Sequence, residues 1–398
     1  MGFTVTVSHP EKTGSMFKSY TSYLVKTLEH GYSVRRRYSD FEWLAELLGK
    51  NYPGMVIPAL PEKTMGSGNE QALRSRMRGL GIFMNAVCSN SYLRGDPVLK
   101  AFMSVADQAG WEAAKKTAGQ EEVSINTQLW VRDISASDIP GNTSRVLADV
   151  KKQLDPLERA LRQLMEATKR LADKSALYAA EMAEMNSSFA AWAGHERAAE
   201  EGSERRNKSA AELTNVMGAS ERMFGAWNDI LTFQPTINEL LLHENVKFQH
   251  KQVGQLRGVL KHYESLQVED AKLVKKLELM EAEVQVMAAK GRADKVAKMD
   301  IEVEQIKRQV KKSHQMVDLF VKGLFSSELQ RFHTDKSALL RELTGQLSAA
   351  HFQFAKRLGV MWQGFIGEIK VDPQAMVEKA RVVFSQSQGL DSFEAGDE

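Results

Sequence analysis

Three consecutive arginines, Arg35, Arg36 and Arg37, are followed by Tyr38 in this sequence. The residues before them have strand-like alternation and helical spacing begins at Asp40, so we predict that the cluster lies where a strand ends and a helix begins. Guanidinium groups bind phosphate oxygens in pairs, and the N–H groups of a helix N-terminus add to such a site. Tyr38 offers a flat face to a sugar-like ring. The cluster therefore indicates a phosphate-binding site.

A structural role for part of this cluster is the alternative. A triple arginine is usually a solvated strand edge or part of an ion pair. Arg35 and Arg36 fit that description, and Arg36 has Asp40 and Glu42 within reach in the predicted helix. From the residues alone, both interpretations stay open.

Two further basic elements lie downstream. Lys63 closes a proline-rich loop, and Arg74, Arg76 and Arg78 follow on a predicted helix. Residues 1–104 carry 13 basic and eight acidic side chains, although the whole chain of 398 residues has a net charge of only +2. Positive charge is thus concentrated in the N-terminal part. The near-neutral total excludes a protein that coats nucleic acid through bulk charge, so we predict no nucleic-acid partner.

The N-terminal part is predicted to contain strands followed by helices. Residues 3–7 alternate as in a strand, residues 9–15 (HPEKTGS) indicate a turn, and residues 16–38 indicate two strands around a turn near Gly31. Helical spacing follows on both sides of a loop rich in proline and glycine; the helices are residues 40–52, 70–89 and 97–105, and the loop is 53–68. This order of elements predicts an α+β domain with a three-stranded sheet.

The rest of the chain is predicted to be long helix. Apolar residues recur there in alternating steps of three and four, which is the a/d seam of a coiled coil. The first seam consists of Leu154, Leu157, Leu161, Leu164, Leu171, Tyr178, Met182, Met185, Phe189 and Trp192, with Thr168 and Ser175 in its two gaps.

Two breaks divide the helical pattern into three long helices. Gly194 and Gly202 mark the first break and residues 289–294 the second, whereas Pro235 is predicted to kink the second helix without ending it. We expect an all-α elongated three-helix coiled-coil bundle. So much apolar seam, including Trp227 and Trp362, is expected to be buried in part against a second chain.

A basic cluster is predicted at one hairpin tip of this bundle. Eight basic residues lie with four acidic ones between positions 290 and 312; they are Lys290, Arg292, Lys295, Lys298, Lys307, Arg308, Lys311 and Lys312. A lysine near an anionic leaflet contributes roughly 1 kcal/mol to membrane binding. The cluster is interpreted either as a membrane-contact surface or as an ordinary charged helix exterior.

The N-terminal motifs resemble those of the PX (phox homology) domain. The strings RRYSDF, PALPEK and LGIFMNAV occur in that family's order and approximate spacing, within about residues 1–105. The resemblance implies binding to phosphoinositides on endosomes, most often phosphatidylinositol 3-phosphate. It implies that Arg37 grips the 3-phosphate and that Tyr38 packs under the inositol ring. It also implies that Lys63 binds the 1-phosphate and that Arg76 reaches the 4- and 5-hydroxyls.

The loop before Lys63 departs from the PX pattern at Ala59, where many members have a second proline. Its apolar residues are expected to insert into the bilayer as a wedge; they are Met55, Val56, Ile57 and Leu60.

As a whole, the chain resembles the PX-BAR sorting nexins, in which a PX domain precedes three long helices. The resemblance implies a PX domain over residues 1–105, a linker over 106–142, a BAR-like dimerisation domain over 143–375 and a C-terminal tail over 376–398. It implies a homodimer, or a heterodimer with another sorting nexin, that senses or generates curvature of anionic membranes in endosomal protein sorting. The alternatives are a non-curving coiled-coil scaffold docked through its PX domain, and an enzyme regulator whose PX domain binds protein.

No pattern indicates an enzyme, a metal site or a cofactor. The motifs GxxxxGK[ST], HExxH and GxSxG are absent, and no GxGxxG follows a strand. The single cysteine, Cys88, is expected in the core, and His243 and His250 are expected at the surface. No run of 18 apolar residues and no secretory signal occurs, so we predict a cytoplasmic protein peripheral on endosomes. The acidic end of the tail is expected to be disordered.

Overall fold

The structure is a computed structural model of the chain, and two compact units are described from it separately. It describes residues 3–15, 18–63, 70–120, 125–139, 141–201 and 208–386. Unit 1 comprises Met1–Met165 and Glu244–Arg341, and unit 2 comprises Glu166–His243 and Glu342–Glu398.

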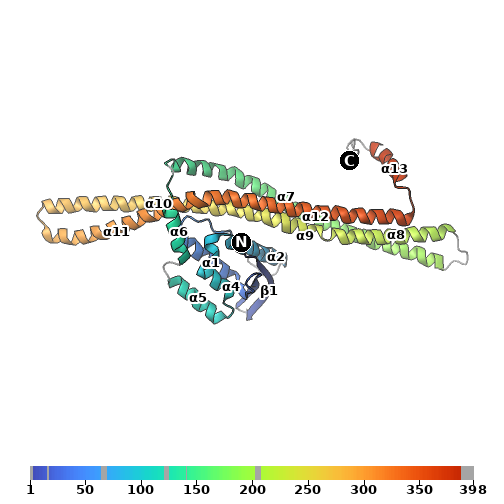
Figure 1. Cartoon of the computed structure of the whole chain (residues 1–398), viewed down its shortest axis with the longest axis horizontal. Coiled ribbons are helices and arrows are strands. Elements are labelled where there is room, and N and C mark those ends of the chain that lie inside the picture. The colour runs from blue at the N-terminus through green and yellow to red at the C-terminus, as the bar shows by residue number, and fades with distance from the viewer. Residues whose placement is uncertain are drawn as a thin grey trace. The chain divides into compact units, whose positions relative to one another are not determined.

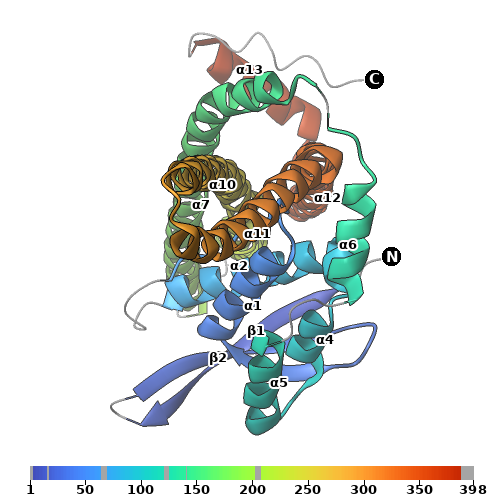
Figure 2. The ribbon, with the colours of Figure 1, turned by 90° about the vertical axis from the view of Figure 1, so that its left-hand side faces the viewer.

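Unit 1 begins with an antiparallel sheet in the order β1-β2-β3. Its strands are β1 Val5–Ser15, β2 Lys18–Thr27 and β3 Ser33–Arg37. Figure 1 labels β1, and Figure 2 labels β1 and β2. The prediction of a turn over residues 9–15 is wrong, because these residues belong to β1. The register with β2 shifts between Ser8 and Glu11, and His9 has a φ of +46°. This bulge accommodates Pro10, which cannot donate a ladder hydrogen bond.

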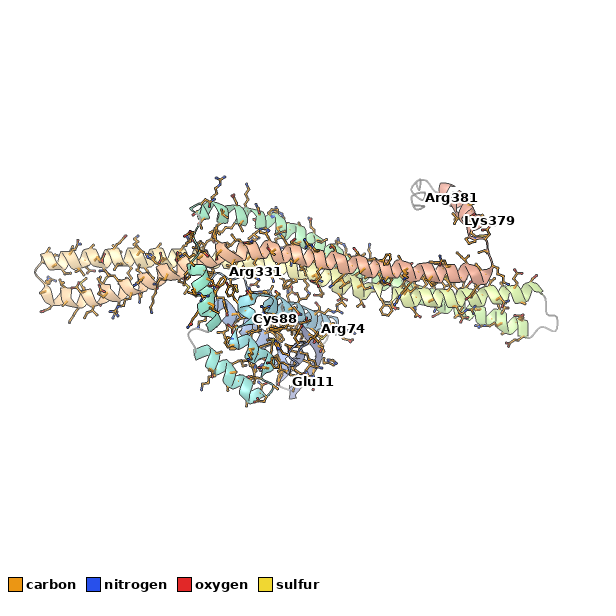
Figure 3. The ribbon with its side chains drawn as sticks, viewed as in Figure 1. Glu11, Arg74, Cys88, Arg331, Lys379 and Arg381 are labelled. Carbon is orange, nitrogen blue, oxygen red and sulfur yellow. The ribbon has the colours of Figure 1, made fainter. Side chains whose placement is uncertain are left out.

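Four helices pack with this sheet, of which three were predicted from their apolar spacing and the short α3 was not. They are α1 Tyr38–Asn51, α2 Glu70–Ser89, α3 Ser91–Arg94 and α4 Pro97–Ser104. Asn90 accepts hydrogen bonds from two N–H groups of α3, and Asp96 caps α4 ahead of its first-turn proline. Cys88 is fully buried in this core, as predicted, and burial raises the pKa of its thiol to about 12 (Figure 3).

The described part of residues 106–142 does not behave as a separate linker. It forms α5 Gln108–Gln120 and α6 Ile125–Ser135, and both helices complete the core of the N-terminal domain. Trp111 and Trp130 are fully buried, with the ring of Trp111 edge-on to that of Phe102 at 5.6 Å. Figure 2 shows α5 beside α4. The sequence pattern alone could not show which core these tryptophans join.

The helical part of unit 1 contains the start of α7 Thr143–Glu201, then α10 Glu244–Ala289, α11 Ala293–Gly323 and the start of α12 Leu329–Ile369. A π-helix, η2 Leu324–Glu328, joins α11 to α12. The predicted turn between α10 and α11 is confirmed, and Gly291 adopts a φ of +67° there. Seam residues from α7, α10 and α11 form one buried cluster, as a three-helix coiled coil requires.

Unit 2 contains the rest of α7 and α12 together with α8 Lys208–Leu231, α9 Gln234–Ile237, η1 Asn238–His243 and α13 Pro373–Gln386. The pattern resumes after Pro235, as predicted, but the helix does not continue through it: α8 ends at Leu231, and Pro235 lies in the first turn of α9. The predicted break at Gly194 is wrong, because α7 continues through it to Glu201. Part of the predicted tail is α13, whereas the acidic end lies outside the described residues.

The two polar gaps in the α7 seam are filled by a polar layer inside unit 2. Thr168 Oγ1 lies 3.2 Å from His243 Nδ1, and Asn238 donates to Ser175 Oγ at 2.7 Å. His243 is therefore buried, with 8% of its surface exposed, and the prediction that it lies at the surface is wrong. A buried imidazole is tolerated here because Thr168 satisfies one of its ring nitrogens.

Candidate functional site

Arg37 lies at the junction between β3 and α1, where the strand pairing ends and the first helical turn begins. Its backbone N–H donates to Asp40 Oδ2 at 3.0 Å, which fixes the start of the helix. Its guanidinium is held more loosely: Nε lies 3.7 Å from Asp40 and Nη2 lies 3.7 Å from Glu112 of α5. The buried Nε has no hydrogen-bond partner among the described residues. Arg37 thus keeps donor capacity for an anion.

Tyr38, Lys63 and Arg76 come together beside Arg37. The Tyr38 hydroxyl donates to the carbonyl oxygen of Pro61 at 2.6 Å, which fixes the ring against the proline-rich loop. Lys63 Nζ lies 5.9 Å and Arg76 Cζ lies 5.5 Å from the centroid of that ring. Burial raises the pKa of Tyr38 to about 12, so the phenol stays neutral. Two cations and an aromatic face therefore share one site, and Arg37 directly precedes Tyr38 in the chain.

Acidic neighbours partly balance this positive charge. Lys63 Nζ lies 2.9 Å from a carboxylate oxygen of Glu42, and both groups reach solvent. Lys115 of α5 lies 3.2 Å from Asp40 and 2.9 Å from Glu112. Because exposed ion pairs contribute little free energy, a phosphate group can replace Glu42 or Glu112 as the partner of these cations.

The other two arginines of the triplet have structural partners. Arg36 is 1% exposed and donates to the carbonyl oxygens of Phe102 at 2.9 Å and Val105 at 2.6 Å, with its guanidinium 4.3 Å from the Trp111 ring centroid. Burial lowers the pKa of Arg36 to about 10, and Asp40 partly opposes this shift. Arg35 lies 2.6 Å from Glu11. These contacts agree with a structural role for Arg35 and Arg36. The hydrogen-bond partners of Arg36 are main-chain carbonyl oxygens, whereas the sequence suggested the carboxylates of Asp40 or Glu42.

The expected membrane wedge does not fit this structure. Met55, Val56 and Ile57 have exposed fractions of 3%, 4% and 8%, and Leu60 is half-buried. Met55 and Ile57 belong to the core of the N-terminal domain, and Val56 packs into the seam of the helical bundle. A bilayer wedge needs exposed apolar side chains, so the prediction is wrong for these residues in the described arrangement. The sequence showed their apolar character but not which surface covers it.

The predicted basic tip lies at the turn from α10 to α11 and along α11. All eight of its basic residues are exposed. Lys307 has a partner, because its Nζ lies 3.1 Å from Glu281 of α10, and this contact raises the pKa of the lysine. An exposed basic tip remains compatible with both interpretations made from the sequence.

Sequence reasoning missed the acidic and basic groups that other elements bring to this region. Glu112 and Lys115 reach Arg37 and Asp40 from α5, while Glu328 and Arg331 reach the loop before Lys63 from η2 and α12. The only local signal was the helical spacing of Glu112 and Lys115 after Trp111. Their proximity to the arginine cluster depends on tertiary packing.

The described residues were also searched for metal sites and for membrane-spanning helices. Among the described residues, no cluster of three or more histidine, cysteine, aspartate or glutamate side chains is arranged to hold a metal ion. Within the same residues, no helix is both long and apolar enough to cross a bilayer.

Comparison with known proteins agrees with this architecture. The family model for the PX domain matches residues 25–106. Sorting nexin MVP1 of Kluyveromyces lactis is 40% identical over 113 residues, which are 26% of this chain and 22% of that protein. The same-named protein of Saccharomyces cerevisiae gives the same identity and coverage. The chain thus aligns with about a fifth of the length of these fungal relatives.

Two other comparisons extend over almost the whole chain. Sorting nexin-30 of Xenopus tropicalis is 23% identical over 376 residues, which are 91% of this chain and 75% of that protein. A cryo-EM structure of the SNX-BAR Mvp1 tetramer has a TM-score of 0.63 at 18% identity, and it covers 92% of this chain and 99% of that one. At this identity the structural match shows a shared fold. The chain therefore contains a PX domain, and over most of its length it is similar to sorting nexins and shares the fold of a solved SNX-BAR protein.

Proposed function

We propose that this chain binds phosphatidylinositol 3-phosphate and acts as a peripheral protein of endosomal membranes in protein sorting. The observation that carries the proposal is the convergence of Lys63 and Arg76 on the Tyr38 ring, with the 40% exposed side chain of Arg37 at the preceding position. Arg37 grips the 3-phosphate, and Tyr38 supports the inositol ring. Lys63 then takes the 1-phosphate and Arg76 the ring hydroxyls.

The test compares two arginines on the same face of β3. Arg37 and Arg35 both have 40% exposed side chains, but Arg35 already contacts Glu11, Ser22 and the His9 carbonyl. We expect Arg37→Gln to weaken binding to vesicles containing phosphatidylinositol 3-phosphate by about ten- to a hundredfold, since a charged hydrogen bond contributes roughly 1.5–3 kcal/mol. Arg35→Gln is the control and is expected to change binding by less than about threefold. Equal effects of the two substitutions would exclude the assignment of Arg37.

A second chain is part of the proposal because a heptad stripe of α7 is uncovered in unit 2. Leu171, Tyr178 and Trp192 occupy seam positions seven and fourteen residues apart, yet their exposed fractions are 47%, 46% and 51%. Seam residues of a coiled coil are normally buried. We propose that a second copy, or another sorting nexin, covers this stripe, and that the resulting dimer senses or generates curvature.

An assay on vesicles of defined size distinguishes a curvature-sensing or curvature-generating dimer from a non-curving scaffold. Curvature activity predicts that the purified dimer tubulates vesicles or binds small vesicles more tightly than large ones. A dimer that binds both sizes equally and leaves their shape unchanged would support a non-curving scaffold.

A further inference from the structure

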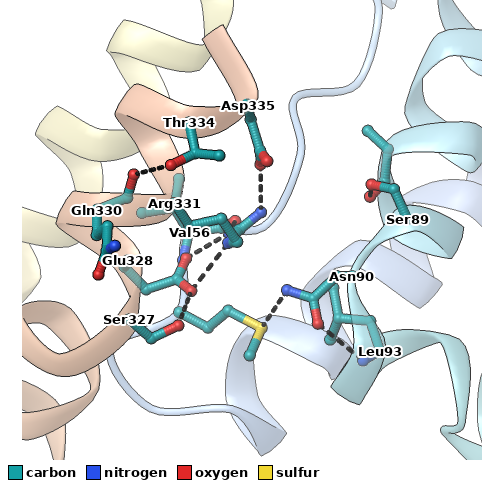
Figure 4. Close-up of polar contacts among 12 residues, drawn as sticks. Val56, Ser89, Asn90, Leu93, Ser327, Glu328, Gln330, Arg331, Thr334 and Asp335 are labelled. Atoms are coloured by element: carbon teal, nitrogen blue, oxygen red, sulfur yellow. Dashed lines mark hydrogen bonds and ion pairs between the residues drawn. The ribbon is translucent and has the colours of Figure 1, made fainter. Parts of the chain in front are cut away.

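The proline-rich loop that presents Lys63 is held by the helical bundle as well as by its own domain. At its start, both backbone polar groups of Val56 bind bundle side chains: the N–H donates to Glu328 Oε2 at 2.7 Å, and the carbonyl accepts from Arg331 Nη2 at 2.7 Å (Figure 4). At its end, the Pro61 carbonyl accepts from Tyr38. The loop is therefore fixed on both sides of the segment that leads to Lys63.

The Val56 contact is built from buried charges. Glu328 is fully buried and forms an ion pair with Arg331, which also contacts Asp335 at 3.1 Å. Burial disfavours the Arg331 charge, but Glu328 and Asp335 outweigh this effect and raise its pKa. Buried charges require such partners, so removal of either one leaves Val56 and the remaining charge unsatisfied.

The backbone of the loop and the backbone of α11 approach so closely beside Val56 that two glycines leave no room for a side chain. A Cβ atom on Gly54 would lie 2.3 Å from the Phe320 carbonyl oxygen, and one on Gly323 would lie 2.8 Å from the Pro53 carbonyl oxygen. Glu328 belongs to η2, and π-helical turns occur often at functional sites. The loop is thus in van der Waals contact with the end of α11 as well as hydrogen-bonded to the residues that follow it.

A second bundle contact lies one residue from Arg76. Ser75 Oγ donates to Glu244 Oε1 at 2.7 Å and accepts from Lys247 Nζ at 2.9 Å. Glu244 is 4% exposed. One turn further along α10, Lys251 lies 3.4 Å from the Leu60 carbonyl oxygen. The bundle therefore holds the elements that carry both Lys63 and Arg76.

We propose that the BAR-type bundle forms part of the scaffold of the headgroup site, with Glu328, Arg331 and Glu244 as positioning residues for Lys63 and Arg76. This inference rests on the proposed lipid-binding function. Because binding and positioning are linked, headgroup binding must in turn stabilise the contact between the loop and η2. Lipid recognition and the conformation of the bundle are then coupled within one chain.

The test uses the full chain and a water-soluble short-chain phosphatidylinositol 3-phosphate, so that membrane contacts do not contribute. The double substitution E328L/R331M replaces the buried ion pair with apolar groups of similar size, which such sites usually tolerate. We expect it to weaken headgroup binding, measured by calorimetry, by about tenfold, and to lower the thermal midpoint because the buried N–H and carbonyl of Val56 lose their partners. Asp335→Asn is the matched control, because it removes an Arg331 partner but leaves the Val56 contact, and it is expected to bind normally.

A milder substitution keeps the test decisive if the double variant unfolds. Ser75→Ala removes the Glu244 contact beside Arg76 and is expected to weaken headgroup binding by about three- to tenfold. Ser89→Ala, on the same helix, removes only a bond to the Ala86 carbonyl and is expected to have no effect.

Hydrogen exchange gives a readout that a purely structural role would not change. Headgroup binding to the native chain should slow amide exchange in residues 53–63 and 324–331 together, and E328L/R331M should abolish the effect in 324–331. If the native chain binds headgroup and the variants bind it equally well, the positioning role is excluded and the lipid function stands. If the native chain binds no headgroup, the proposed function itself fails.

Discussion

Arg36 and Arg37 have different surroundings because the side chains of a strand alternate between its two faces. Arg36 points into the core, where main-chain carbonyls and Trp111 surround it. Arg37 points toward solvent and keeps a donor without a partner among the described residues. The residue types and their order were enough to predict the cluster. They could not show that Glu112 would face Arg37, since that contact depends on where α5 docks.

Replacement of Arg36 tests its structural role. Arg36→Met removes the donors that satisfy the Phe102 and Val105 carbonyls, and it loses the contact with Trp111. We expect the free energy of unfolding to fall by about 2–4 kcal/mol, because buried acceptors lose charged donors. Denaturant unfolding of the full chain measures this change. A loss below about 1 kcal/mol would show that water replaces the guanidinium without cost.

At the scale of elements, helical periodicity predicted the long helices and the turn between α10 and α11, but not the end of α8 at Leu231, and the loops needed tertiary information. The apolar run before Lys63 has the composition of a membrane wedge, yet Met55 and Val56 are buried against two different cores. Residues 9–15 contain Pro10 and Gly14 and were therefore predicted as a turn, but strand pairing with β2 continues around a bulge. The apolar run is covered by residues distant in sequence, whereas residues 9–15 are held by the adjacent strand β2.

Gly54 tests how tightly the loop and α11 approach. Its φ is +80°, and an added Cβ would lie 2.3 Å from the Phe320 carbonyl oxygen. We expect Gly54→Ala to lower the free energy of unfolding by at least about 2 kcal/mol, through strain and steric overlap. Gly254→Ala is the control, because this α10 residue has open space around its Cβ position and is expected to gain about 0.5–1 kcal/mol. Similar effects at both positions would contradict the close approach.

Across the whole molecule, the proposed headgroup site and the proposed membrane-contact surface consist of separate groups of residues. The proposed headgroup site lies in the PX domain, and the exposed basic tip lies at the turn from α10 to α11. The net charge of +2 hides this arrangement, because acidic residues elsewhere offset both clusters. Two independent contacts on one dimer would combine through avidity.

The two contacts can be separated by substitution. We expect K295E/K298E/K311E/K312E to weaken binding to vesicles of anionic lipid without phosphoinositide by at least about tenfold, since each lysine contributes roughly 1 kcal/mol near the surface. Binding of short-chain phosphatidylinositol 3-phosphate should not change. Arg37→Gln should show the reverse pattern. If the quadruple variant binds anionic vesicles normally, the tip is an ordinary solvated helix surface.

The α7 stripe provides the corresponding test of dimerisation. L171D/Y178D places charges on seam positions that are about half exposed in the single chain, so the folded chain tolerates them better than a dimer interface does. We expect light scattering to show a monomer that keeps its affinity for the short-chain lipid but binds vesicles at least about a hundredfold more weakly, because avidity is lost. Leu28→Asp, at an exposed leucine after β2, is the control and should remain a dimer. A variant that stays dimeric would mean that another surface joins the two chains. A monomer that binds vesicles as tightly as the native protein would instead show that one PX domain is sufficient for membrane attachment.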